Sequence, residues 1–165
     1  TRAPRVYLNG ANLHVGQTVQ LTPEQTRYLV SVMRLRDGNP VRVFDGVNGE
    51  FLAAVASSSS SSSRLERSGE KIGSGRGEIE LVFAPIRKQR LKMLVEKAVE
   101  VGASRLTPVL TARTQKGAVS DASMLGRLGA VTAVEAAEQC ERMTVPPVAS
   151  PVTLASYLRS LELRH

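Results

Sequence analysis

The sequence is poor in the residues that build disulfides, metal sites and aromatic surfaces. Its 165 residues include one cysteine, Cys140, and two histidines, His14 and His165. A single thiol excludes an internal disulfide and a cysteine-based zinc site, so we expect no metal. Aromatic residues make up 4% of the chain and tryptophan is absent, which argues against a stacking surface for single-stranded nucleic acid. No apolar run approaches the roughly twenty residues of a membrane span, so we expect no membrane partner.

Positive charge is in excess and unevenly placed. Basic residues outnumber acidic residues by 22 to 15, and 17 of the 22 are arginines, whose planar guanidinium groups suit phosphate. Residues 1–44 carry a net charge of +4 and residues 84–117 carry +6, whereas residues 45–83 carry −2. We therefore expect two modules that each face a polyanion, with RNA or DNA as the first partner to consider. Charge that serves only solubility is the alternative.

The first module is predicted to be small and rich in β-structure. Short runs with alternating apolar residues mark its strands, and the turn pairs Asn9-Gly10 and Asn48-Gly49 separate them. The expected strands cover residues 5–8, 18–21, 41–44 and 50–55.

One helix is predicted within this module. Thr22-Pro23-Glu24-Gln25 forms a capping box with proline at the first helical position. The helix should stop before Asp37-Gly38. Its spacing predicts one apolar face, made of Tyr28, Leu29, Val32 and Met33.

A low-complexity segment follows. Ser57–Ser63 is a run of seven serines, and the sequence stays polar and glycine-rich as far as Gly77. Such a composition buries little apolar surface, so residues 57–77 are predicted to form a flexible loop or linker. A regulatory role for the serine run is the less favoured alternative.

The second module is predicted to be α/β. A strand, a helix and a second strand follow one another, which indicates a βαβ unit with a parallel sheet. The helix has apolar residues at i, i+3, i+4, i+7 and i+8, and Gly102 follows it as a C-terminal cap. The expected elements are strands at 78–84 and 105–110, and helices at 88–101, 121–140 and 154–163.

No common catalytic motif is present. The chain has no Walker loop, no G-x-G-x-x-G after a strand and no H-E-x-x-H. Three groups of charged residues are candidates for function instead, although capping, solvated charge or a surface salt bridge would also explain each of them. They are Arg2 with Arg5 before the first strand, Arg34 with Arg36 at the end of the first helix, and Glu138 with Arg142 near the end of the long helix.

Five longer motifs occur in order along the chain. They are Arg2-x-x-Arg5-Val6-Tyr7; Tyr28-Leu29-x-x-Val32-Met33-Arg34; Phe44-Asp45-Gly46-x-Asn48-x-Glu50-Phe51; Lys92-x-x-x-x-Glu96-Lys97-x-x-Glu100-x-Gly102 with Thr107-Pro108 and Arg113; and Glu135-Ala136-Ala137-Glu138-Gln139-x-x-Arg142-x-x-Val145-Pro146. In order and spacing these motifs resemble the RsmE family, whose members methylate N3 of a uridine in small-subunit (16S-type) ribosomal RNA.

The resemblance implies a fold and a chemistry. It implies a PUA-like β-barrel that binds RNA over residues 1–76 and the first part of a SPOUT methyltransferase domain over residues 77–165. The family uses S-adenosylmethionine (SAM), bound in a trefoil knot, and usually works as a homodimer on small-subunit rRNA or the assembled small subunit. By this resemblance Arg2, Arg5, Arg34, Arg36 and Arg113 are expected to bind RNA, and Glu138 and Arg142 to be catalytic.

The resemblance stops short of the knot. Nothing in the chain matches the family's Gly-Pro-Glu-Gly-Gly-like and Leu-Arg-x-Glu-Thr-Ala-like segments, so the SPOUT domain is expected to be incomplete and the cofactor residues to lie beyond His165. A catalytically incomplete RNA-binding or ribosome-assembly protein is therefore the first alternative, and a structural ribosomal protein is the second. The expected compartment is the cytoplasm if the source is bacterial, and a chloroplast or mitochondrion if it is eukaryotic.

Overall fold

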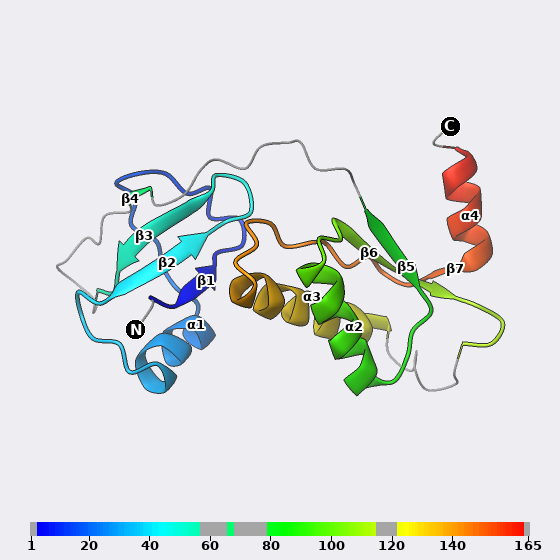
Figure 1. Ribbon diagram of the computed structural model, residues 1–165, viewed down its shortest axis with the longest axis horizontal. Coiled ribbons are helices and arrows are strands. Elements are labelled where there is room, and N and C mark those ends of the chain that lie inside the picture. The colour runs from blue at the N-terminus through cyan, green and yellow to red at the C-terminus, as the bar shows by residue number, and fades with distance from the viewer. Residues whose placement is uncertain (1–2, 57–65, 68–78, 115–121, 164–165) are drawn as a thin grey trace. The chain divides into compact units, whose positions relative to one another are not determined.

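The structure is a computed structural model that describes residues 3–56, 66–67, 79–114 and 122–163 (Figure 1). The chain divides into two compact units, Thr1–Gly75 and Arg76–His165. Among the described residues, no helix is long and apolar enough to cross a membrane, and no three histidine, cysteine or carboxylate side chains gather where a metal ion could bind.

Unit 1 is built on a four-stranded sheet with the order β1-β2-β3-β4. Its strands are β1 (Arg5–Tyr7), β2 (Pro40–Phe44), β3 (Glu50–Ala54) and β4 (Glu66–Arg67). The hairpin between β2 and β3 is antiparallel, as the turn residues predicted, and β1 pairs with β2 in parallel. A parallel pair needs a crossover, which here contains the helix α1 (Pro23–Arg27) and the π-helical turn η1 (Tyr28–Val32).

The core of unit 1 lies between the sheet and this crossover. It is formed by Val6, Leu8, Leu13, Leu29, Val41, Val43 and Phe51. The predicted capping box is confirmed, because the Thr22 side chain accepts a hydrogen bond from the backbone N–H of Gln25 while the Gln25 side chain accepts one from the N–H of Thr22.

Two predicted features of unit 1 are wrong. Residues 18–21 form no strand. Val19 and Leu21 do pack against the core, as their alternation predicted, but the segment pairs with no neighbouring strand. Within the predicted linker, Glu66–Arg67 pairs with β3 as β4. The rest of residues 57–77, including the serine run, lies outside the described residues.

The predicted apolar face of the first helix is also wrong. Leu29 is fully buried, but Tyr28, Val32 and Met33 are exposed. The cause lies in the backbone: the turn after Arg27 is π-helical, so the residues after Leu29 no longer follow the 3.6-residue spacing that the prediction assumed.

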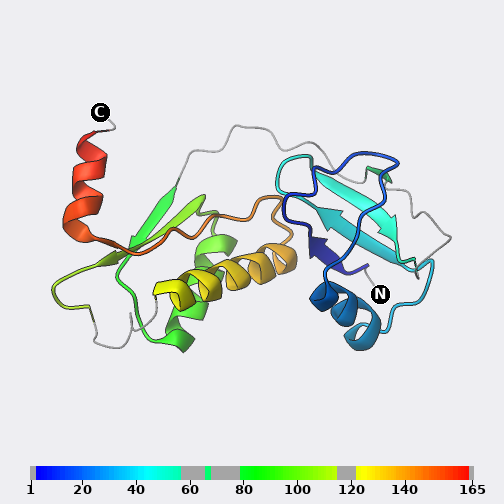
Figure 2. The same ribbon diagram turned by 180° about the vertical axis from the view of Figure 1, so that it is seen from behind.

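Unit 2 contains a parallel three-stranded sheet with the order β5-β6-β7. Along the chain the elements are β5 (Glu80–Phe83), α2 (Lys88–Glu100), β6 (Arg105–Leu110), α3 (Ala122–Gln139), β7 (Val152–Thr153) and α4 (Leu154–Glu162). The predicted βαβ unit and all three helices are confirmed. Helices α2 and α3 pack against each other and lie side by side in both views (Figures 1 and 2).

Strand β7 was not predicted. Its two residues are exposed and show no apolar pattern, so only their position beside Val109 and Leu110 of β6 makes them a strand. The break at Pro146-Pro147 is confirmed: the chain leaves α3 and returns along β6, where the N–H of Leu106 donates to the Pro147 carbonyl (3.0 Å) and the N–H of Ala149 donates to the Leu106 carbonyl (2.9 Å).

Candidate functional site

Arg5 lies inside unit 1 and takes part in a buried ion cluster. Its Nε donates to Glu50 Oε2 (2.5 Å), and Arg42 Nη1 donates to Glu50 Oε1 (3.3 Å). The Arg5 and Glu50 side chains are only 3% and 8% exposed. The Arg5 guanidinium also stacks on Phe44, with its carbon 3.7 Å from the ring centroid. The expectation that Arg5 contacts RNA phosphate is therefore wrong for this conformation, because the charge is buried and already paired.

Asp45 organises the turn between β2 and β3. Its carboxylate accepts hydrogen bonds from the N–H groups of Leu13 (2.8 Å), Val47 (2.9 Å) and Asn48 (2.7 Å) and from the Asn48 side-chain amide (2.7 Å). Burial by itself would raise the pKa of Asp45, but these donors outweigh it and hold the pKa below its usual range. Asp45, Asn48 and Glu50 of the Phe44-to-Phe51 motif thus make hydrogen bonds and ion pairs within unit 1, so this motif has a structural role there.

The remaining arginines of the first basic block differ from Arg5. Arg34 and Arg36 are both exposed and lie beyond the C-terminus of η1. Arg34 has a left-handed backbone, with φ of 56°. Arg2 lies outside the described residues. The two exposed guanidinium groups are accessible to a phosphate, whereas that of Arg5 is not.

Unit 2 collects exposed cations at one edge of its sheet. β5 and β6 are parallel neighbours, so the residues that follow them leave the sheet at the same edge. Arg87, Lys88 and Arg90 follow β5 at the start of α2, and Arg113 follows β6 in a turn closed by Thr111 and Thr114; all four cations are exposed. In open α/β sheets the carboxyl edge is the usual ligand-binding side. Sequence reasoning singled out only Arg113; the signal it missed is the basic first turn of α2.

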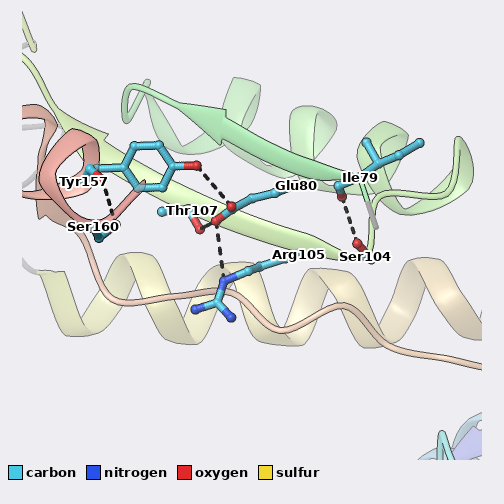
Figure 3. A network of polar contacts seen from close by, with 7 residues as sticks. All are labelled: Ile79, Glu80, Ser104, Arg105, Thr107, Tyr157 and Ser160. Atoms are coloured by element: carbon cyan, nitrogen blue, oxygen red, sulfur yellow. Dashed lines mark hydrogen bonds and ion pairs between the residues drawn. The ribbon is translucent and has the colours of Figure 1, made fainter. Parts of the chain in front are cut away.

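Glu80 joins three elements of unit 2 (Figure 3). Its carboxylate accepts hydrogen bonds from Thr107 Oγ1 (2.5 Å) and Tyr157 Oη (3.0 Å), and Arg105 Nε lies 3.5 Å away. The network therefore ties α4 to β5 and β6. Thr107 is buried, and Glu80 is only partly exposed. No sequence motif pointed to Glu80, since its partners lie 25 to 77 residues away along the chain.

Arg142 connects the ends of the two long helices. α3 ends at Gln139, and two residues later Glu141 adopts a left-handed backbone, with φ of 61°. The Arg142 side chain then donates from Nη1 to the Val99 carbonyl in the last turn of α2 (3.0 Å) and from Nε to Thr144 Oγ1 (3.2 Å). Arg142 and Glu138 are both partly buried. The small residues Ala133, Ala136 and Ala137 on the same helix are buried, and their size permits close packing against a neighbouring backbone.

Both units match known protein families. Residues 21–66 match the RNA methyltransferase PUA domain, and residues 74–164 match the RNA methyltransferase domain. The ribosomal RNA small subunit methyltransferase E of Rickettsia conorii is 27% identical over 157 residues, which are 94% of this chain and 62% of that protein. The protein of the same name from Synechocystis sp. is 29% identical over 145 residues, which are 87% of this chain and 46% of that protein.

Solved structures show the same fold. A ribosomal RNA small subunit methyltransferase E from Neisseria gonorrhoeae, bound to S-adenosyl methionine, has a TM-score of 0.74 at 26% identity, covering 95% of this chain and 65% of that one. A protein from Legionella pneumophila, solved in complex with the cofactor SAM, has a TM-score of 0.74 at 25% identity, covering 96% of this chain and 66% of that one.

The chain spans less than two thirds of the length of these relatives. Within this chain the two domain matches follow one another without overlap, at residues 21–66 and 74–164. The resemblance seen in the motifs is confirmed, and the chain belongs to the RsmE family of RNA methyltransferases.

Proposed function

We propose that the protein containing this chain methylates N3 of a uridine in small-subunit (16S-type) rRNA, with SAM as the methyl donor. The observation that carries the proposal is the joint match of both units to an RNA methyltransferase domain and its PUA domain. The name of the curated relatives supports the substrate. The SAM bound to the Neisseria gonorrhoeae relative supports the cofactor.

The exposed cations give this chain its part in the reaction. Arg34 and Arg36 in unit 1 and Arg113 in unit 2 would bind RNA phosphates, together with the basic start of α2. Holding the RNA backbone at several points aligns the target base with the methyl donor, which lowers the barrier through proximity. The uridine N3 must also lose its proton, and a positioned base or cation assists that step.

Glu138 and Arg142 remain our candidates for the catalytic cleft or the dimer contact. Their partial burial and the link from Arg142 to the last turn of α2 support a fixed position for the Arg142 side chain. A fixed guanidinium group is better suited to stabilise developing negative charge than a mobile one, because no reorganisation is needed during reaction.

The described residues do not supply an evident cofactor site. A carboxylate that binds the hydroxyl or ammonium groups of SAM needs acceptor atoms that are not already engaged. The two buried carboxylates among the described residues, Asp45 and Glu50, have internal partners. We therefore assign no described residue to the cofactor and derive no step through it.

The partners follow from the proposed reaction. We propose that the protein acts on small-subunit rRNA or the assembled small subunit, as a homodimer. The reaction would take place where ribosomes assemble, in the cytoplasm of a bacterium or inside a chloroplast or mitochondrion.

Methyl transfer to small subunits tests the function. The protein, at the length its gene encodes, is incubated with methyl-labelled SAM and with small subunits that lack the modification. We expect one methyl group per rRNA, which nuclease digestion and mass spectrometry place on uridine N3. RNA binding without any methyl transfer would favour the alternative of an RNA-binding or ribosome-assembly protein.

The phosphate contacts are tested by salt dependence. Each lost contact should reduce the slope of log K against log salt by about 0.7–0.9, so Arg36→Ala and Arg34→Asn should each lower it; asparagine suits the left-handed backbone at position 34. Arg159→Ala, on exposed α4, is the matched control. Unchanged slopes in both test variants would contradict the assignment.

A further inference from the structure

The segment Arg27–Arg36 exposes four apolar side chains, three of which belong to the face that the sequence spacing predicted to be buried. Tyr28 is 42% exposed, Val30 48%, Val32 64% and Met33 38%. These four exposed residues lie within six positions of one turn, and they leave apolar surface in water that a partner could cover. We call residues 27–36 the η1 segment.

The backbone of the η1 segment holds these side chains outward. Leu29 is fully buried and Leu35 packs partly against the core, so both ends of the turn are anchored. The N–H of Leu35 donates to the Leu29 carbonyl (3.0 Å), and the N–H of Met33 donates to the Tyr28 carbonyl (2.9 Å). All five residues between the two leucines are exposed.

The same turn contains two uncommon conformations. Residues 28–32 form a π-helical turn, a conformation that occurs frequently at functional sites. Arg34 adopts a left-handed backbone, with φ of 56°, although it is neither glycine nor asparagine. Such conformations persist only where the surrounding structure holds them, and they cluster at sites that bind ligands.

The chemistry of the η1 segment fits nucleotides with unstacked bases. The segment contains three arginines, Arg27, Arg34 and Arg36, all exposed, and no acidic residue. An exposed aromatic ring offers a face for a base, while arginine offers both a phosphate contact and a second stacking plane. A duplex keeps its bases stacked inside and would leave the apolar residues uncovered.

We propose that the η1 segment binds unpaired nucleotides of the RNA, with the Tyr28 ring stacking on a base, Val32 and Met33 covering its edge, and Arg34 and Arg36 pairing with the phosphates. The proposal rests on the proposed function, in that RNA is the substrate, and adds that the bound part of it is single-stranded. It also revises the expectation, drawn from the low aromatic content, that the chain has no stacking surface for single-stranded nucleic acid. One exposed tyrosine in a turn of fixed conformation is enough to stack on one base.

A second copy of the chain is a poorer occupant. A two-fold interface brings the same surface of both copies face to face. Three arginines on each side, without a carboxylate in either segment, would then repel each other.

The experiment measures binding of the 165-residue chain to a labelled uridine-containing RNA 12-mer, single-stranded or annealed to its complement, by fluorescence anisotropy. We expect the single strand to bind more tightly. Tyr28→Ala should weaken its binding about tenfold, the scale of one lost base stack, with little change for the duplex. Tyr28→Phe keeps the ring and should bind as the parent does. Val32→Ser should weaken the single strand as well.

Val15→Ser is the matched control, since Val15 is exposed in the same unit but outside the segment. Circular dichroism confirms that each variant folds, which is expected because Leu29 and Leu35 are unchanged. Parent-like binding of the single strand by Tyr28→Ala, or equal affinity of the parent for both RNAs, would overturn the proposal. The proposal would also be overturned if Val32→Ser bound RNA normally but lost self-association in sedimentation, because the apolar residues would then contact a second copy of the chain.

The two proposals can fail separately. If the protein transfers no methyl group but Tyr28→Ala still weakens the binding of single-stranded RNA, the proposed methyltransferase function is rejected and the binding of unpaired nucleotides by the η1 segment stands. If the protein methylates uridine N3 but Tyr28→Ala has no effect, the function stands and the η1 proposal is rejected.

Discussion

Replacing Arg5 by alanine should destabilise unit 1 rather than act directly on RNA binding. The change removes one cation of a buried cluster and leaves Glu50, which is 8% exposed, paired with Arg42 at 3.3 Å. Breaking a buried pair from one side costs about 3–5 kcal/mol. Because Arg42 still compensates part of the Glu50 charge, we expect the lower end, about 3 kcal/mol. The lost stacking on Phe44 contributes to the same figure.

This loss is large for a unit of this size. A change of about 1 kcal/mol shifts the Tm of a domain of 60–100 residues by about 4–8 °C, so unit 1 should melt about 12–24 °C lower. Arg5→Lys should fall in between, since lysine keeps the charge but loses the planar group that lies on Phe44.

Hydrogen exchange is the assay, because it reports on the amides of β1, β2 and β3 separately from those of unit 2. Arg36→Ala is the matched control: it removes an exposed arginine of the same basic block and should change stability by less than about 0.5 kcal/mol. The reasoning is refuted if Arg5→Ala costs less than about 1 kcal/mol and yet weakens RNA binding as strongly as Arg36→Ala.

Three further predictions follow from the structure. The folded-state pKa of Asp45 lies below its usual value, so its contribution to stability is complete above the unfolded pKa of about 4 and is lost as the pH falls through the folded pKa. Asp45→Asn should therefore lower the urea midpoint at pH 7 and make the midpoint fall less steeply as the pH is lowered. A midpoint that falls with pH as steeply in Asp45→Asn as in the parent would contradict this. Arg142→Ala should reduce methyl transfer by the gene-length protein at least tenfold, about 1.4 kcal/mol, whereas full transfer with a lower Tm would leave Arg142 a structural link between α2 and α3. The 165-residue chain should not bind SAM tightly, since it lacks the segments that resemble the family's knot, and micromolar binding in a titration calorimeter would show that this is wrong.

Local signals in the sequence were enough for most helices and for the second unit. The capping box at Thr22–Gln25, Gly102 after α2 and the apolar spacing of α2 each act within a few residues, so their structural outcome depends little on the rest of the chain. The β2–β3 hairpin was predictable for the same reason, since its turn residues adopt the required backbone locally.

The family motifs predicted membership, but not what each motif residue does. Arg5 and Arg34 occur in neighbouring motifs and looked alike as candidate phosphate contacts. Their difference comes from Glu50, 45 residues after Arg5, which sits on β3 and pairs with Arg5 in the interior. No pattern within either motif carries that information.

Tertiary structure also decided which apolar residues face outward. Strand β7 exists because the chain returns beside β6, and residues 18–21 are not a strand because none lies beside them. The η1 segment has the apolar residues of a buried face, yet the core accepts only Leu29 and part of Leu35. Burial depends on which surfaces the whole fold brings together, whereas the sequence by itself determines only local backbone preference and apolar spacing.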